Sequence, residues 1–256
     1  MKIYTAERNS GQEQSDNVIH HRHLIAYNEA EKMISGTVLE IGSGEGYGIR
    51  ILSPRSNKYF ALDKHRTPVD DNSGKVIFRQ AIIPPLEGFE DNYFDFVVTF
   101  QVLEHIKNDA LFLREIKRVL KPGGKLILTT PNKLMSLTRN PWHIREYTPE
   151  QFTRLISTCF DDAEINGVYG NEKVMAYHEE NRRSVRKFTR FDILRMQYWL
   201  PRFLLQIPYD LANRMNRRRI MKESSRLVSD VTTSDFSIKE MSQSCFDYFC
   251  IATKTI

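Results

Sequence analysis

Short apolar runs alternate with amphipathic stretches through the middle of the chain. Five runs rich in aliphatic and β-branched residues are expected to be strands, and they span residues 37–41, 59–63, 76–79, 94–100 and 125–130. The run 94–100 is nearly continuous in apolar and β-branched residues, which is typical of a strand buried on both faces of a sheet. A further run near the end of the chain, 246–252, is predicted to return to the same sheet.

Helical periodicity appears between these runs. Residues 19–34 predict one helix, and residues 108–120 predict another with apolar side chains at helical spacing. Asn108 or Asp109 can cap the second helix, and the Pro-Gly-Gly that follows ends it. Residues 148–151, Thr-Pro-Glu-Gln, have the form of a capping box with proline at the first helical position. Strands that alternate with helices predict a mostly parallel sheet covered on both faces.

The composition fits a globular protein of one or two domains. The 256 residues are 41% hydrophobic and 27% charged, enough for a sizeable core. No run of about 18 apolar residues appears, and the first residues lack the apolar core of a signal peptide. The three cysteines form no Cys-x-x-Cys pair, so neither a zinc site nor a disulfide framework is expected. These features predict a cytoplasmic protein.

The positive charge is concentrated in one segment. Residues 181–226 hold 13 basic and three acidic residues, a formal charge of +10, which leaves −5 for the rest of a chain whose total is +5. Apolar and aromatic residues are interleaved with these arginines, and Pro201 and Pro208 are expected to break the segment into helical pieces. The segment is either a solvated helical cap or an interfacial element that touches anionic lipid or a lipid-linked acceptor. Nucleic acid is the partner we expect least, because no nucleic-acid-binding motif accompanies the charge.

A glycine-rich stretch follows the first strand. Gly42, Gly44 and Gly46 let the backbone adopt positive φ angles and pass close to a ligand. The dinucleotide pattern G-x-G-x-x-G/A is not met, because its sixth position is Tyr47 or Ile49 depending on the glycine from which it is counted. A nicotinamide-dependent reductase is therefore the alternative that the spacing disfavours.

The form acid-x-Gly-x-Gly-x-Gly, which begins at Glu40, resembles the first motif of the class I S-adenosylmethionine-dependent methyltransferases. Residues 90–106 are similar to the family's fourth-strand motif, and residues 119–130 to its post-helix turn and fifth strand. Asp63 ends the second strand, where a carboxylate can accept hydrogen bonds from both ribose hydroxyls. The resemblance covers residues 38–131 and is strongest to the type 11 group, which acts on small molecules and glycans.

The resemblance implies a cofactor site for S-adenosylmethionine along these motifs. Gln80 stands where many relatives carry aspartate, and its amide oxygen can still accept from the adenine amino group. The resemblance implies that the methionine end of the cofactor is contacted by Glu40, Gly42, Gly44 and Gly46, and the ribose by Asp63. It also implies that the adenine is contacted by Gln80 and Ala81, and that Phe100 and Gln101 lie near the methyl group.

The expected fold is a doubly wound, Rossmann-like α/β sheet of about seven strands with an antiparallel last strand and a helical insert before it. Residues 1–36 are expected to form an N-terminal helical lid and residues 37–176 the methyltransferase core. Residues 177–240 are expected to form the basic insert, and residues 241–256 the final strand of the core.

Two histidines are candidates for catalysis. Methyl transfer requires a general base only where the acceptor must lose a proton, as a hydroxyl does, and histidine suits that role near neutral pH. His143 lies in a loop after the fifth strand, although it can instead simply pair with Glu146 or a carbonyl. His105 follows the fourth strand and can equally be structural. Histidines 20, 21 and 23 are interpreted as lid or surface residues, and no metal site is expected.

The sequence thus predicts methyl transfer from S-adenosylmethionine to a small-molecule, glycan or lipid-linked acceptor. Two alternatives remain besides this interpretation: an NAD(P)-dependent reductase, and a catalytically silent relative that binds the cofactor and serves as a partner subunit. The peripheral contact, if lipid is the partner of residues 181–226, is expected at the inner face of the membrane.

Overall fold

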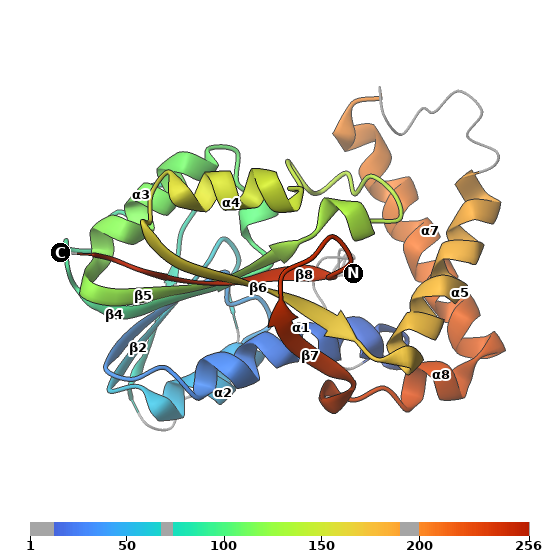
Figure 1. The fold of residues 1–256 in the computed structure, drawn as a ribbon, viewed down its shortest axis with the longest axis horizontal. Helices are drawn as coiled ribbons and strands as arrows, with labels where there is room; N and C mark the ends of the chain where they lie inside the picture. Colours follow the sequence, from blue (N-terminus) through green and yellow to red (C-terminus); the bar gives the residue numbers. More distant parts are fainter. Residues whose placement is uncertain (1–12, 68–73, 190–199, 256) are drawn as a thin grey trace.

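One sheet of eight strands organises the protein. The computed structural model describes residues 13–67, 74–189 and 200–255. The strand order is β3-β2-β1-β4-β5-β8-β6-β7 (Figure 1). The strands are β1 Thr37–Ile41, β2 Lys58–Asp63, β3 Val76–Gln80, β4 Phe94–Phe100, β5 Leu120–Pro131, β6 Asp162–Gly170, β7 Phe236–Glu240 and β8 Asp247–Thr253.

The first five strands run parallel, and β8 inserts antiparallel between β5 and β6. The predictions of a mostly parallel sheet and of an antiparallel final strand are confirmed. The expected number of about seven strands is wrong by one, because β7 pairs with β6 at the edge of the sheet. That strand lies inside the predicted insert, 177–240. Its five residues are only half buried, so their hydrophobic pattern is too short and weak to reveal a strand.

Helices cover both faces of the sheet and one of its ends (Figure 1). The helices are α1 Asn17–Glu31, α2 Tyr47–Leu52, α3 Asp109–Val119, α4 Pro149–Ser157, α5 Glu172–Thr189, α7 Arg202–Glu223 and α8 Ser225–Ser229. Short 3-10 turns are η1 Gln14–Asp16, η2 Ser53–Arg55, η3 Leu103–His105, η4 Lys133–Met135 and η5 Thr233–Asp235. Two buried clusters follow from this layering, one under α3 and α4 and the other under α1 and α2.

The predicted helix caps are present. The side chain of Asn108 accepts a hydrogen bond from the backbone nitrogen of Leu111 at 3.1 Å. Thr148 and Gln151 form the complete capping box at the start of α4, with Pro149 in the first turn. These local signals are legible in the sequence because each involves residues only three positions apart.

The sheet has one edge at which a ligand site is expected. The order reverses between β1 and β4, and ligands of doubly wound sheets bind outside the carboxyl ends of the strands at such a switch point. The antiparallel β8 begins at this same edge, because Asp247 pairs with Pro131 at the end of β5.

The basic segment forms helices at the end of the sheet. Pro201 caps α7, as a helix-breaking residue can, but the expected break at Pro208 is wrong, because α7 continues through it. A proline inside a helix removes one backbone hydrogen bond and strains the preceding turn. Here the contacts of α7 with α5, α8 and η1 stabilise the helix and offset this loss. Residues 190–199, which carry part of the predicted aromatic pattern, lie outside the described residues.

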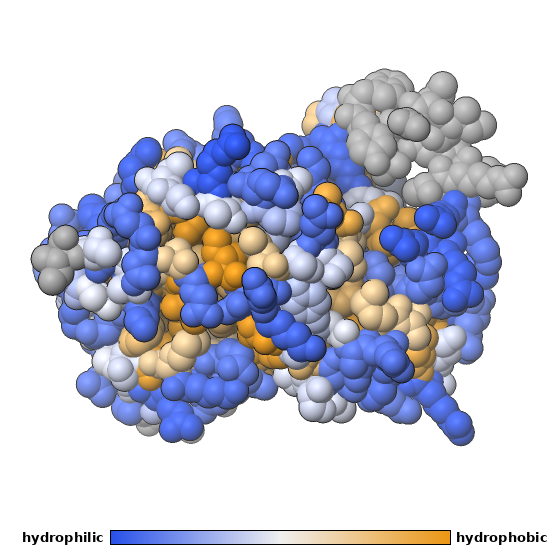
Figure 2. Space-filling model, viewed as in Figure 1, coloured by the Kyte–Doolittle hydropathy of each residue, from blue (hydrophilic) through white to orange (hydrophobic). Residues whose placement is uncertain are grey.

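The face of the molecule seen in Figure 2 carries apolar patches surrounded by hydrophilic surface. Within the described ranges, every helix falls short of the length and apolarity that a membrane crossing requires. The three cysteines are unpaired and buried.

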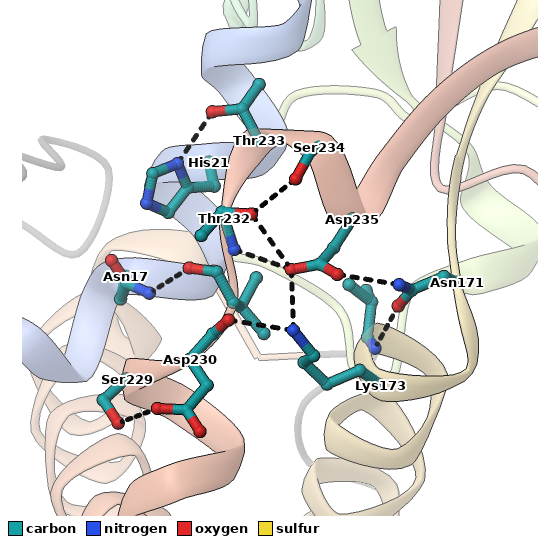
Figure 3. A network of polar contacts seen from close by, with 12 residues as sticks. Asn17, His21, Asn171, Lys173, Ser229, Asp230, Thr232, Thr233, Ser234 and Asp235 are labelled. Atoms are coloured by element: carbon teal, nitrogen blue, oxygen red, sulfur yellow. Dashed lines mark hydrogen bonds and ion pairs between the residues drawn. The ribbon is translucent and has the colours of Figure 1, made fainter.

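A polar network ties the N-terminal helix to the segment that follows α8 (Figure 3). The ring of His21 lies 2.8 Å from the hydroxyl of Thr233, and Asn17 donates to the carbonyl of Val231 at 2.8 Å. From α5, Lys173 contacts the carboxylate of Asp235 at 3.1 Å. Helices α1 and α5 and the chain between α8 and β7 therefore form one connected cover beside the carboxyl edge of the sheet.

Candidate active site

The glycine loop joins β1 to α2. Gly42, Gly44 and Gly46 have φ angles of +83°, +52° and +77°, which glycine adopts without strain. A Cβ atom on Gly42 would lie 2.3 Å from a methyl group of Val102, whereas one on Gly44 would meet nothing within 4 Å. Gly42 is therefore required by packing within the fold. The open space beside Gly44 leaves its backbone accessible to a ligand.

Asp63 lies beside this loop at the end of β2. Its carboxylate accepts hydrogen bonds from the backbone nitrogens of Gly44 at 2.9 Å and His65 at 2.8 Å. The loop after β1 and the end of β2, which are 19 residues apart in the chain, are thus joined through one side chain. This arrangement orients the carboxylate at the edge where a ribose is expected.

Glu40 lies beneath the loop and not in it. Its side chain is 1% exposed, and its two oxygens accept hydrogen bonds from the hydroxyls of Tyr27 at 3.0 Å and Tyr59 at 2.9 Å. Burial raises the pKa of Glu40 to about 7, although both tyrosine hydrogen bonds favour the ionised form. A Cβ atom on Gly48 would lie 2.3 Å from this carboxylate, so the glycine allows α2 to pack against it.

The residues expected near adenine lie at the end of β3. The side-chain nitrogen of Gln80 donates to the carbonyl of Lys64 at 3.0 Å. The backbone nitrogen of Ala81 donates to the backbone carbonyl of Asp63 at 3.0 Å. Ile82, which follows them, has 86% of its surface exposed. This side chain was not predicted as a site residue, and its aliphatic surface is suited to pack against a flat base.

Phe100 and Gln101 end β4 and differ in their surroundings. Phe100 is buried and meets the ring of Tyr27 edge-on, with 4.6 Å between centroids. Gln101 has a φ angle of +57°, which is uncommon for a residue with a side chain and is found mostly at turns and functional sites. Its side chain lines a cavity at this edge of the sheet, while its backbone nitrogen donates to the carbonyl of Thr129.

A cavity of about 220 Å³ lies at this edge, beyond Gln101. Its walls come from α1, from η3, from the chain between β5 and α4, and from α5 and α7. Carboxamides are frequent among its lining residues, which include Gln101, Asn132, Asn140, Asn181, Asn213 and Asn216. Carboxamides both donate and accept hydrogen bonds, so the cavity suits a ligand with several hydroxyl groups.

His143 and Glu146 lie together on the wall of the cavity. Nδ1 of His143 is 2.5 Å from Glu146 Oε1, and Nε2 is 2.8 Å from the side-chain nitrogen of Asn140. The oxygen of that amide accepts from the backbone nitrogen of Trp142, which fixes its orientation. The imidazole therefore donates through Nδ1 and accepts through Nε2, the tautomer that presents a basic nitrogen to a partner.

Glu104 and His105 lie next to His143. Potential ligand atoms of the three residues all lie within 4.8 Å of one another. Nδ1 of His105 is 3.1 Å from the carbonyl of Trp142, and Thr130 donates to the Glu104 carboxylate at 2.9 Å. Burial raises the pKa of Glu104. Thr130 and the carbonyl of Trp142 thus hold Glu104 and His105 beside His143.

The loop that carries His143 is held from three sides. Ile144 donates its backbone nitrogen to the carbonyl of Glu104 at 2.7 Å, and Arg145 forms an ion pair with Asp109 of α3. From α7, Arg202 donates to the carbonyl of Ile144 at 2.7 Å, and Asp210 accepts from the Trp142 ring at 3.0 Å. The helical insert thus fixes the position of the histidine loop.

An ion pair between a partly exposed arginine of the cavity wall and a buried carboxylate lies on another side of the cavity. Nε of Arg22, on α1, lies 3.0 Å from the carboxylate of Asp247 at the start of β8. Burial raises the pKa of Asp247, while the Arg22 charge and a hydrogen bond from Gln101 act in the opposite direction. Neither charged residue was predicted as a site residue, since 225 positions of the sequence separate them.

A second hollow of about 430 Å³ lies along the same loop. It shares Ser136, Asn140, His143 and Glu146 with the first cavity, so the two are adjacent. Its basic lining residues are Lys133, Arg139, Arg145 and Arg202.

The structure brings together most of the residues expected at the site. The loop glycines, Asp63, Gln80 and Ala81 lie along one edge. Farther along it the rings of His105 and His143 meet, and Gln101 lines the same cavity as His143. Glu40 and Phe100 lie below the surface. The rings of His20 and His21 on α1 meet in a T-shaped arrangement, whereas His23 lines the cavity. The cavity residues on α5 and α7 were not predicted.

Comparisons with known proteins agree with this geometry. Residues 39–128 match a family model described as a methyltransferase domain. Two relatives are named as probable S-adenosylmethionine-dependent methyltransferases. One, of Mycolicibacterium smegmatis, is 31% identical to this chain over 175 residues, and the other, of Mycobacterium tuberculosis, is 33% identical over 175 residues. These alignments cover 64% of this chain, and 68% and 64% of the relatives, so the chain spans about two thirds of their length.

A solved structure shows the same fold across the chain. It is a Haemonchus contortus phosphoethanolamine N-methyltransferase in complex with its phosphorylated ligand and S-adenosylhomocysteine. The TM-score is 0.51 with 16% identity, and the alignment covers 99% of this chain and 61% of that one.

Proposed function

This chain belongs to the S-adenosylmethionine-dependent methyltransferases, and on that premise we propose that it methylates a hydroxyl oxygen of a polar acceptor. The observation that carries this proposal is the His143–Glu146 pair on the wall of a polar cavity that Gln101 also lines. Nucleophiles such as amines and thiols can be methylated without such a pair. A hydroxyl oxygen requires help with its proton.

The residues along the sheet edge fit S-adenosylmethionine. When bound, this cofactor supplies a methyl group on a positively charged sulfur, so the methyl needs no further activation. We assign the backbone of Gly44 to the methionine end, Asp63 to the ribose hydroxyls, and Gln80, Ala81 and Ile82 to the adenine. Support comes from the open space at Gly44, the fixed carboxylate of Asp63 and the exposed surface of Ile82.

Glu40 and Phe100 take supporting roles in this proposal. Their burial favours a function beneath the cofactor site, in which Glu40 holds Tyr27 and Tyr59, and Phe100 packs against Tyr27. Gly42 and Gly46 shape the loop through their positive φ angles.

His143 acts as the general base on the acceptor. Glu146 accepts a hydrogen bond from Nδ1–H, orients the ring and stabilises the imidazolium that forms when Nε2 takes a proton. The acceptor hydroxyl takes the place of the Asn140 amide at Nε2, and Gln101 lies on the same cavity between the histidine loop and the cofactor edge. His105 and Glu104 position the loop, since Glu104 binds it through its backbone carbonyl.

The acceptor we propose is polyhydroxylated and carries an anionic group, as a phosphorylated or lipid-linked sugar does. The carboxamides of the first cavity, the one that Gln101 lines, favour hydroxyl groups. The basic residues of the second hollow favour an anion next to them. A flat apolar acceptor would offer no hydrogen bonds to these polar groups.

The experiment uses cell extract and S-adenosylmethionine with an isotopically labelled methyl group. Mass spectrometry should find a labelled product whose methyl is attached to oxygen, and S-adenosylhomocysteine should accumulate in parallel. The variant His143→Gln should form both about 10²–10⁴-fold more slowly while still binding S-adenosylhomocysteine. A product labelled on nitrogen, carbon or sulfur would refute the hydroxyl proposal, and cofactor binding without any product would favour a silent partner subunit.

A further inference from the structure

Helix α7 has two faces of opposite character. Tyr209, Asn213, Asn216 and Arg217 lie on one face and line the cavity. At 100° per residue, positions 203, 207, 211 and 215 fall on the other side of the helix. Surface helices usually turn their apolar face to the protein core. This helix does the reverse, with its polar face inward and apolar side chains outward.

The outward apolar side chains are strongly exposed. Exposed fractions are 69% for Phe203, 80% for Ile207, 60% for Leu211 and 58% for Met215, with Leu204 beside them at 52%. These five make up most of the exposed large hydrophobic residues in the part of the chain that the structure describes. Single exposed apolar residues are common, but a continuous stripe of them marks an interaction surface.

Basic residues continue the same face toward the end of α7. Arg214, Arg218 and Lys222 follow the apolar residues at helical spacing, and all three are exposed. We define the outer face as these three residues with Phe203, Leu204, Ile207, Leu211 and Met215. Arg217 does not belong to it, because it pairs with Asp16 at 2.7 Å and lines the cavity.

The neighbouring helix adds to this charge. Arg182, Arg183, Arg186 and Lys187 of α5, which contacts α7, are exposed as well. Figure 2 shows apolar and strongly hydrophilic surface side by side at this end of the molecule. Apolar residues next to a concentration of cations match the two components of an anionic bilayer surface, its acyl boundary and its head groups.

We propose that the outer face of α7 rests on an anionic lipid bilayer. The apolar residues enter the boundary below the head groups, and Arg214, Arg218 and Lys222 contact lipid phosphates. A protein partner would have to provide an apolar groove that ends in an acidic patch, whereas an anionic bilayer offers both everywhere on its surface. The inner face of α7 lines the cavity, so docking holds the acceptor site about one helix diameter, roughly 10 Å, from the lipid.

Co-sedimentation with vesicles tests this proposal with the full-length protein. The vesicles are phosphatidylcholine alone, or phosphatidylcholine with phosphatidylglycerol, each at low and high salt. We expect at least tenfold tighter binding to the anionic vesicles at low salt, and a decrease as salt is raised.

Two double variants separate the components of the outer face. Ile207→Ser with Leu211→Ser should weaken binding about tenfold or more at both salt concentrations. Arg218→Gln with Lys222→Gln should weaken it mainly at low salt. Leu134→Ser, which removes an exposed apolar side chain (49%) that lies outside α7, is the matched control and should bind vesicles as the wild type does. Thermal melting and S-adenosylhomocysteine binding verify that each variant is folded.

Equal binding to neutral and anionic vesicles, or no effect of Ile207→Ser with Leu211→Ser, would overturn the proposal. So would a stable dimer in solution that the same double variant dissociates, because the outer face would then be a protein interface. None of these outcomes depends on methyl transfer, so the proposed function stands or fails separately.

Discussion

The cofactor side and the acceptor side of the cleft are assembled differently. Each contact assigned to the cofactor comes from the end of a neighbouring parallel strand, within residues 44–82. The acceptor cavity instead collects residues from α1, η3, the His143 loop, α5 and α7, which extend from position 19 to position 246. The first side is a property of the common fold, and the second is a property of what this chain adds to it. A variant on one side should therefore leave the other side's ligand unaffected.

The largest effect is expected on the acceptor side. His143→Gln should lower turnover by about 10²–10⁴-fold, the usual contribution of a general base, while S-adenosylhomocysteine affinity stays within twofold. His178→Gln, on the opposite wall of the cavity, is the matched control and should cost less than tenfold. Labelled-methyl turnover and calorimetry measure the two quantities. Equal losses in both histidine variants would show that His143 has no special role.

Beneath the cofactor loop, Glu40 should make stability depend on pH. Its pKa is raised to about 7 in the fold, so the folded state holds this proton more tightly than the unfolded state does. The resulting stabilisation is complete below about pH 4.5 and is lost as the pH rises through about 7. The loss is on the order of 3 kcal/mol.

Denaturant unfolding of the wild type and Glu40→Gln across this pH range measures the difference. Burial raises the pKa values of Glu104 and Asp247 as well. Because both proteins retain these two residues, the part of the pH dependence of stability that comes from them should be the same in the wild type and the variant. Parallel pH profiles for the two proteins would contradict the assignment to Glu40.

On the cofactor side, Asp63→Asn should weaken S-adenosylhomocysteine binding about tenfold to a hundredfold. The variant loses the charge that strengthens hydrogen bonds from ribose hydroxyls and from the Gly44 backbone. Asp162→Asn removes a carboxylate at the start of β6, at the opposite edge of the sheet, and should leave the affinity unchanged. Titration calorimetry distinguishes them, and similar affinities would remove Asp63 from the site.

The smallest effect compares two glycines. Gly44 and Gly123 have φ angles of +52° and +78°, and both have open space where a Cβ would stand. Alanine at either position should cost about 1–2 kcal/mol of stability through the left-handed backbone. Only Gly44→Ala should also weaken S-adenosylhomocysteine binding, by roughly tenfold. If both variants bind it equally well, the backbone of Gly44 does not approach the cofactor.

The difference between the two sides also explains what the sequence could reveal. Strands 37–41 and 94–100, the caps at Asn108 and Thr148, and the proximity of the glycine loop to Asp63 were predictable, because each depends on local pattern or on strand ends in a parallel sheet. His143 was identified as a candidate from its loop position, and its pairing with Glu146 was foreseen as an alternative to catalysis.

The remaining features depend on contacts between distant positions. No local pattern joins Arg22 to Asp247, or Trp142 to Asp210. Strand β7 was missed because an edge strand of five half-buried residues carries little periodicity. The orientation of α7 was hidden too, since an apolar stripe in a sequence predicts burial, and here the polar face is the one turned inward.

The most direct test measures cofactor affinity and methyl transfer in Gly44→Ala and His143→Gln under the same conditions. The account predicts that Gly44→Ala binds S-adenosylhomocysteine more weakly, with turnover recovering as S-adenosylmethionine is raised. His143→Gln should bind S-adenosylhomocysteine like the wild type and transfer the methyl group about 10²–10⁴-fold more slowly at every cofactor concentration. Loss of cofactor affinity in His143→Gln, or wild-type affinity in Gly44→Ala, would contradict the division of the cleft into these two sides.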